Sequence, residues 1–208
     1  ELGAGITLVA EIMPKEKRGY ATTIVAAVGV SGAVVAYFIA QYFDWRTSFF
    51  IGGGLGLSLL LLRFGVAESG MFGKTNNPHT SRGNFFSLFS NQERFIKYLR
   101  CIIIGVPLWF VVGILITLSP EFGKVLGVQG DVNAGAAVAC CYAGLVLGDI
   151  ASGLLSQLLK SRVKVIYTYL FLSIVSISAY FLLHDLSLFA FYSICLFLGF
   201  SVGYWVIF

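Results

Sequence analysis

The chain has 208 residues and a formal net charge of +4; 58% of its residues are apolar and 12% are charged. Soluble domains carry about 25% charged residues, and the mean hydropathy of this chain is +0.87, so the composition excludes an ordinary soluble domain. The basic residues lie between apolar segments and do not gather on one face, which argues against a nucleic-acid-binding protein. We therefore expect an all-α polytopic membrane protein.

Seven apolar segments predict membrane helices, because a spanning helix needs about 20 mostly apolar residues. Both ends of the chain fall inside apolar segments, so we expect the first and last helices to be incomplete. The chain would then be a fragment that packs with the missing helices of the same parent chain. In chain order the segments are residues 1–13, 20–43, 47–66, 98–119, 132–159, 165–183 and 188–208.

A long polar stretch, residues 67–97, divides the chain into one helical half before it, 1–66, and a second helical half after it, 98–208. Aromatic and aliphatic residues recur among polar ones between positions 84 and 99. Two interpretations fit this pattern. It predicts either an amphipathic helix on the membrane surface or the beginning of the next membrane helix.

The loops alternate in charge along the chain. Twelve of the fourteen Lys and Arg residues fall in the polar connector, its flanks and the turns at 14–19 and 160–164, whereas the other turns hold only Arg46 and Lys124. The positive-inside rule assigns basic loops to the cytosol. We therefore expect the connector to be cytosolic, in an integral protein of the plasma membrane, which is the inner membrane of a bacterium.

Small residues distinguish the segments that we expect in the interior of the bundle. Residues 20–43 are rich in Ala and Gly, and residues 132–159 in Ala, Gly and Cys; small side chains let helix backbones approach closely. Residues 165–183 contain no Gly and many bulky side chains. We expect that segment to face lipid.

The turn that follows the first apolar segment carries Glu11 and, seven positions later, Arg18, within AEIMPKEKRG. This spacing resembles the E-x6-R loop after the fourth helix of major facilitator superfamily transporters. WRTSFFIGGG from Trp45, VAESG around Glu68, GLLSQLLKSRVK at 153–164 and the final GYWVIF resemble further elements of that family in the same order. The resemblance implies a fold of two six-helix halves, of which this chain covers about helices four to ten.

The resemblance also implies a cytosolic gate at two matching loops. Glu11 and Arg18 lie in the first loop; Arg162 lies in the second, where Gln157 stands at the family's Asp and Leu158 at its Arg. Salt bridges at this surface can hold one conformation of a rocking bundle, although an isolated exposed pair contributes only about 0–1 kcal/mol. The alternative for Glu11 and Arg18 is ordinary solvation in a loop.

Asp149 is the first candidate for proton coupling. It lies eleven positions before Lys160, and at about 1.5 Å per residue this is about half a bilayer from the cytosolic end. A carboxylate at that depth is costly to keep charged, so it can bind and release a proton during a transport cycle. The alternative is a structural Asp, protonated or paired, that packs against Gly148 and Ser152.

Glu1 is the second candidate carboxylate, because it lies ten residues before Glu11 and so near the same depth. Its alternative is a pair with a basic residue outside the chain. Four aromatic residues lie on segments that the resemblance assigns to the central cavity, where they can stack on a small polar solute; their alternative is packing or interfacial anchoring. They are Trp109, Tyr142, Tyr204 and Trp205.

The sequence has no phosphate-binding Gly loop, metal-ligand cluster or nucleophile triad, so we expect no metal, no cofactor and no enzymatic activity. We expect a secondary active transporter that moves a small polar solute by alternating access, with the lipid bilayer and protons as its other partners. Proton symport is the leading mechanism, and export by proton antiport is the alternative. A receptor or an intramembrane enzyme would also have seven segments, but an enzyme predicts His, Asp or Glu ligands clustered at one depth, and a receptor predicts polar termini.

Overall fold

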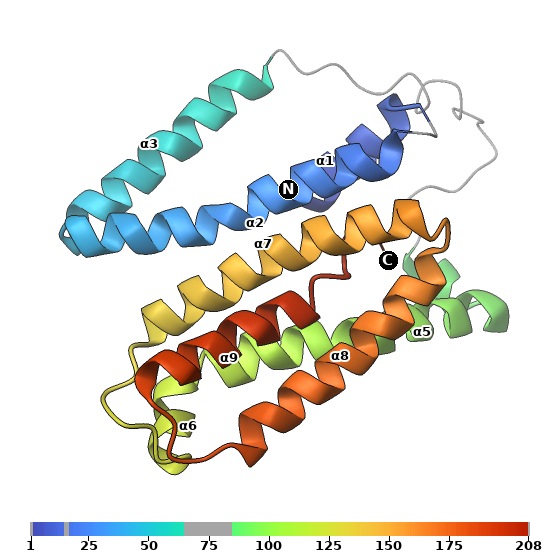
Figure 1. Cartoon of the computed structure of the whole chain (residues 1–208). Helices are drawn as coiled ribbons and strands as arrows, with labels where there is room; N and C mark the ends of the chain where they lie inside the picture. Colours follow the sequence, from blue (N-terminus) through green and yellow to red (C-terminus); the bar gives the residue numbers. More distant parts are fainter. Residues whose placement is uncertain (1, 15–16, 65–84, 208) are drawn as a thin grey trace.

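The computed structural model describes residues 2–14, 17–64 and 85–207, and that part of the chain is built of helices without a β-strand (Figure 1). The α-helices follow one another with short turns, apart from the gap between α3 and η1. In chain order the elements are α1 (Leu2–Ile12), α2 (Arg18–Tyr42), α3 (Trp45–Arg63), the 3₁₀-helix η1 (Phe85–Leu88), α5 (Gln92–Phe110), the π-helix η2 (Val111–Ile116), α6 (Ser119–Val125), α7 (Ala134–Leu158), α8 (Arg162–Leu182) and α9 (Leu188–Ser201).

Five helices of the described residues are long and apolar enough to cross a membrane. They are α2, α3, the continuous α5–η2 helix over Gln92–Ile116, α7 and α8, which confirms the five complete segments predicted from the sequence. The two segments expected to be incomplete form shorter helices, 11 residues in α1 and 14 in α9.

Most of the polar connector lies outside the described residues. Its last part decides between the two interpretations of the aromatic pattern at positions 84–99. Phe85 and Phe86 begin the short η1, whereas Phe95 belongs to α5. The Asn91 side chain accepts a hydrogen bond from the backbone N–H of Glu93 at 2.8 Å and so starts α5 at Gln92. The aromatic residues from Phe95 onward therefore begin the next membrane helix, and no single amphipathic helix covers 84–99.

Pro107 changes the geometry of the span that contains it. Pro has no backbone N–H and cannot complete the α-helical ladder, and α5 gives way to the π-helix η2 only four residues later. The hydroxyl of Thr117 then bonds the carbonyl of Val112, five positions back, at 3.0 Å. The hydroxyl of Tyr180 in α8 reaches the carbonyl of Leu115 at 3.2 Å and ties this widened turn to the core.

The helix α7 lies at the centre of the bundle, between α2 on one side and α9 on the other (Figure 1). Ten of its residues are buried, as the small residues of this segment predicted. The hydrophobic core extends from α7 to α8, α9 and η2. The buried residues of α2 are Thr23, Ala26, Ala27 and Val30.

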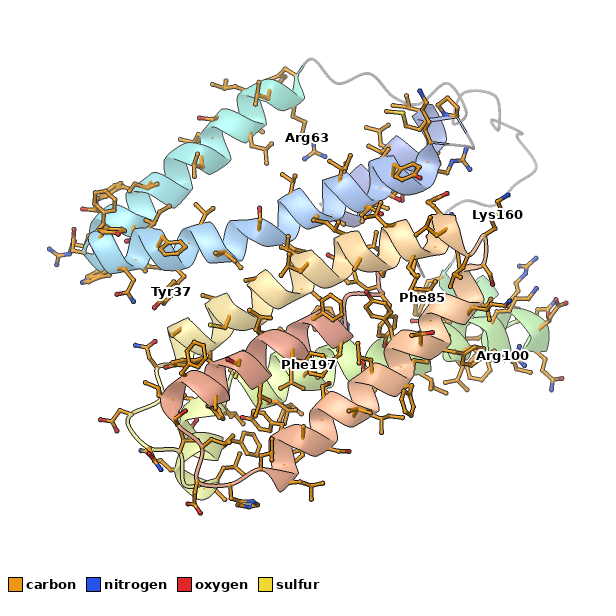
Figure 2. The ribbon with its side chains drawn as sticks, in the orientation of Figure 1. Tyr37, Arg63, Phe85, Arg100, Lys160 and Phe197 are labelled. Carbon is orange, nitrogen blue, oxygen red and sulfur yellow. The ribbon has the colours of Figure 1, made fainter. Side chains whose placement is uncertain are left out.

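The helices α2 and α7 run antiparallel along most of their length. A Cβ added to Gly153 would collide with Thr23, and one added to Gly135 would contact the ring of Tyr37, which Figure 2 labels. These two contacts lie near opposite ends of α7. This pair of helices therefore joins the first helical half of the chain to the second.

The helix α8 buries one face and exposes the other. Val165, Tyr169, Ser173, Ser176 and Tyr180 are buried at helical spacing, while large apolar side chains on the other face are exposed. The exposed face is the one expected toward lipid. The buried face is more polar than the sequence suggested, because hydroxyl groups of this helix bond the end of α9.

Basic side chains gather at one end of the bundle, which we call the basic end; here α2 and α8 begin and α7 ends. It carries Lys17, Arg18, Lys160, Arg162 and Lys164. Figure 2 shows Lys160 and Arg100, near the start of α5, on the same side of the molecule. At the opposite end, the α6–α7 and α8–α9 turns bond each other through the N–H of Gln129 and the carbonyl of Leu186 at 2.9 Å.

Candidate functional site

Asp149 lies at the point where α7 crosses the end of α9, and its side chain has no exposed surface. Both carboxyl oxygens are buried without a hydrogen-bond partner among the described residues. Buried polar atoms nearly always have such a partner, and an exception calls for an explanation. A buried carboxyl group with both oxygens free can exchange a proton or receive a donor from a ligand.

Glycine makes the close crossing around Asp149 possible. Gly144 and Gly148 on α7 face Gly199 in α9 and Gly203 just beyond it, so each of the two segments presents two glycines four residues apart. A Cβ at any of the four would collide with backbone atoms of the other segment. Such spacing brings helix backbones into direct contact in membranes.

Hydrogen bonds from serine hydroxyl groups stabilise the same crossing of α7 and the end of α9. Ser152, one turn after Asp149, donates to the carbonyl of Gly203 at 2.5 Å. On the other side of α9, Ser173 of α8 donates to the carbonyl of Ser201 at 2.8 Å, and the hydroxyls of Ser176 and Ser201 bond each other at 2.8 Å. The segment after α9 is thereby held against both α7 and α8.

Two aromatic residues interact with the Asp149 carboxyl group, and a third packs on one of them. The indole of Trp205 interacts with it, although not with hydrogen-bond geometry, since both oxygens lack a hydrogen-bond partner. Tyr169 of α8 interacts with Asp149 electrostatically and donates its hydroxyl to the carbonyl of Gly148 at 3.2 Å. The rings of Tyr169 and Tyr204 lie 6.4 Å apart, edge to face.

A cavity of about 310 Å³ opens next to this group at the basic end. Its wall comes from both halves of the chain, with α1 and α2 on one side and α7, α8 and the segment after α9 on the other. Trp205 lines it and so connects it with Asp149. The lining residues are Gly3, Ile6, Ala10, Arg18, Gly19, Thr22, Ser156, Arg162, Trp205, Val206 and Ile207.

Comparison with known families supplies the identity of this fold. The family model of the Major Facilitator Superfamily matches residues 2–208. The chain belongs to the major facilitator superfamily. Comparisons with curated proteins and with solved structures gave no match. As a member of this superfamily with five membrane-capable helices among the described residues, the protein is an integral membrane transporter.

Three of the four residues assigned to the gate of this superfamily member meet at the basic end. Arg18 begins α2 and Arg162 begins α8, and both line the cavity. The amide of Gln157 lies against Gly19, close enough that a Cβ there would overlap it. Glu11, one residue before the end of α1, is half-buried and does not line the cavity.

The four aromatic candidates do not form one group. Trp205 lines the cavity, whereas Tyr204 is buried in the core and donates its hydroxyl to the carbonyl of Ile104 in α5 at 2.5 Å. Tyr142 lies two helical turns from Asp149 on the same side of α7 and packs on the core. Trp109 is 71% exposed and lines a separate groove of about 610 Å³ along α5.

The remaining expectations concern the second candidate carboxylate and metal ligands. Glu1, the second candidate carboxylate, lies outside the described residues. Within the described ranges, no three His, Cys, Asp or Glu side chains come together as metal ligands would. Asp149 is therefore the candidate carboxylate whose surroundings can be described.

The sequence interpretation missed the partners of the α7 glycines. Gly199 and Gly203 repeat the four-residue spacing of Gly144 and Gly148, and this repeat was the signal that could have paired the two segments. The interpretation also considered Arg18 and Arg162 for a gate, with loop solvation as the alternative for Arg18, and not for a common cavity. Their common cavity depends on a contact between segments 144 residues apart in sequence, for which the sequence holds no signal.

Proposed function

We propose that this transporter couples the uptake of a small polar solute to protons, and that Asp149 carries the proton. The observation that supports this proposal is the carboxyl group of Asp149, which is fully buried in a membrane helix with neither oxygen hydrogen-bonded among the described residues. An ionised carboxylate without a partner is costly inside a bilayer. Proton uptake removes that cost, and proton release restores the charge when water or a donor reaches the group.

Trp205 controls the access of water to Asp149 in this proposal. The indole interacts with Asp149 and also lines the cavity that opens at the basic end. A solute in the cavity that moves Trp205 would change the access of water to the carboxyl group. Solute binding and proton binding would then influence each other, as coupling requires.

Alternating access would come from rocking of residues 1–66 against residues 98–208, joined by the connector 67–97. The cavity fits this motion, since its walls come from both halves. The contacts between α2 and α7 form the surface along which the halves would slide or separate. Gln157 against Gly19, together with Arg18, Arg162 and Glu11, would form the gate at the basic end.

The basic end is cytosolic in this proposal, because most Lys and Arg residues belong to its loops. The membrane would be the plasma membrane, the inner membrane of a bacterium. The cavity would then face the cytosol, the side on which a symporter releases its solute. Trp205 would contact the solute there, with Glu1 and Tyr142 as further candidates deeper in the bundle.

The test uses the full-length protein in proteoliposomes with an internal pH dye and a panel of sugars, organic acids, amino acids and betaines. We expect one solute to acidify the lumen in the wild type and not with Asp149→Asn. Asp131→Asn is the matched control, because Asp131 is exposed in the turn before α7. Its acidification should equal that of the wild type.

The other outcomes of this experiment are equally informative. Solute-dependent acidification that survives Asp149→Asn would make Asp149 structural and would move the proposal to Glu1. Alkalinisation on solute uptake would reverse the sign of coupling and assign the protein to proton antiport. If no solute moves protons in either protein, proton coupling is wrong.

A further inference from the structure

Two arginine side chains from different halves of the chain line the cavity at the basic end. Arg18 is the first residue of α2 and Arg162 is the first residue of α8. Among the described residues that line the cavity, they are the charged ones, and no carboxylate accompanies them. The described part of the cavity wall therefore combines two positive charges without a negative one.

One nitrogen of the Arg18 guanidinium, its Nε, lacks a hydrogen-bond partner among the described residues. This nitrogen is buried, and no ion pair joins Arg18 to another described residue. Leaving a buried donor of a charged group unpaired is costly. An acceptor that enters the cavity would remove this cost, so the site favours a ligand with negative oxygen atoms.

The hydroxyl groups in the cavity wall do not serve as donors to a ligand. Thr22 donates to the carbonyl of Arg18 at 3.1 Å, and Ser156 donates to the carbonyl of Gly153 at 2.8 Å. Both hydroxyl protons are therefore already donated to backbone carbonyl groups. Among the described residues that line the cavity, the side-chain donors left for a ligand are the two guanidinium groups, because the indole of Trp205 already interacts with Asp149.

The rest of the wall is apolar. Gly3, Ile6 and Ala10 line it from α1, and Val206 and Ile207 line it from the segment after α9. A cavity of about 310 Å³ lies at the small end of the range for small-molecule sites. This combination fits a short carbon skeleton with a carboxylate at one end.

We propose that the cavity binds a small organic acid through its carboxylate, held between Arg18 and Arg162, with its carbon skeleton against α1 and Trp205. The planar fork of arginine suits a carboxylate because two N–H groups can donate in parallel. Since the arginines belong to different halves, the bound acid would link the halves at the basic end. This inference rests on the proposed transport function and names the chemical class of its solute.

The test measures binding by isothermal titration calorimetry with the full-length protein in nanodiscs of phosphatidylcholine, which carries no net charge. The probes are acetate, lactate, succinate, citrate and benzoate, with propane-1,2-diol and butane-1,4-diol as neutral analogues of lactate and succinate. We expect at least one acid to bind and neither diol to bind. The affinity should fall as salt rises, because Arg162 is exposed and its attraction is screened.

Substitutions locate the site. We expect Arg18→Gln and Arg162→Gln each to weaken binding of that acid at least tenfold, and Arg18→Lys to weaken it less, because it keeps the charge but loses the fork. Arg46→Gln is the matched control: Arg46 is the second residue of α3, at the opposite end, with its guanidinium carbon 5.1 Å from the centre of the Trp45 ring. Thermal unfolding of each variant checks that it is folded.

Three results would overturn the inference. In the first, no acid of the panel binds. In the second, an acid binds both glutamine variants as tightly as it binds the wild type. In the third, the substitutions of Arg18 and Arg162 change only the stabilisation of the protein by phosphatidylglycerol, which would make this a lipid site. The proton assay separates this inference from the proposed function. An acid that binds through the arginines but moves no protons refutes only proton coupling, whereas a neutral solute that moves protons while no acid binds refutes only the anion site.

Discussion

Gly148 on α7 and Gly203, just beyond α9, meet backbone to backbone beside Asp149. The contact continues to Asp149 itself, since a Cβ on Gly203 would also lie against its backbone nitrogen. The hydroxyl of Ser152 bonds the carbonyl of Gly203 from the next turn. The position of the candidate proton carrier is thus fixed by a crossing that only glycine permits, and changes at this crossing should affect both stability and transport.

The first prediction concerns this crossing. Gly199→Ala should destabilise the protein by about 1–3 kcal/mol, because the new Cβ would collide with the backbone carbonyl of Cys141, which cannot move aside as a side chain can. The matched control is Gly32→Ala in α2, where a Cβ meets nothing within 4 Å. Thermal unfolding in detergent compares the two. Equal unfolding temperatures for both variants would contradict the close crossing.

The second prediction concerns the contact between Gln157 and Gly19. The N-terminus of α2 carries a partial positive charge, which an acidic side chain stabilises by about 0.3–1 kcal/mol. Gln157→Glu keeps the shape of the side chain and adds the charge next to Gly19. We expect it to hold the two halves together at the basic end and to slow transport.

Thiol labelling measures this effect directly. Ala10 lines the cavity, so Ala10→Cys, made together with Cys101→Ser to remove an exposed thiol, reports how often the cavity opens. We expect Gln157→Glu to slow labelling of this cysteine. The control Gln41→Glu adds the same charge at an exposed position near the C-terminus of α2 and should not slow it. Faster labelling with Gln157→Glu would show that the contact does not close the gate.

The third prediction concerns pH and the start of α3. Asp44 accepts hydrogen bonds from the Thr47 hydroxyl at 2.5 Å and from the backbone N–H of Arg46 at 3.2 Å. The hydrogen bond from Thr47 is the largest cause that lowers the pKa of Asp44 below its ordinary 3.8. Stabilisation by this charged cap is therefore complete above the ordinary pKa and is lost as the pH falls through the lower pKa of the folded state.

Accordingly, Asp44→Ala should unfold at a lower temperature than the wild type at neutral pH, and the difference should shrink as the pH falls below about 3.8. Asp44→Asn keeps a capping oxygen without a charge, so its stability should show no such dependence in the acid range. Thermal unfolding across that range is the measurement. A difference between Asp44→Ala and the wild type that stays constant with pH would contradict the role of the charged cap.

The fourth prediction concerns orientation. Lys160 lies in the α7–α8 turn at the basic end, and Lys124 lies in α6 at the opposite end. In intact cells, an impermeant maleimide should label Lys124→Cys and should label Lys160→Cys only after the cells are opened. The reverse pattern would place the basic end outside and would turn the cavity toward the exterior.

The sequence by itself determined the class of the protein. Five spans, the basic end and the interior position of α7 follow from hydropathy, loop charge and small residues. These properties depend on the solvent around each segment. A bilayer requires every spanning segment to be mostly apolar and to satisfy its backbone hydrogen bonds internally. The distance of Asp149 from the end of α7 follows as well, because the rise per residue of a helix is constant.

Only the tertiary structure decided which helix faces meet. Tyr204 and Trp205 are neighbours in sequence, yet one lies in the core and the other lines the cavity. The helix ends soon after Gly199, so helical periodicity does not fix where these side chains point. Likewise, the cavity of Arg18 and Arg162 and the unpaired carboxyl of Asp149 arise from contacts between distant segments. Local sequence patterns specify helices and their depth, whereas the partners of a side chain depend on packing across the whole bundle.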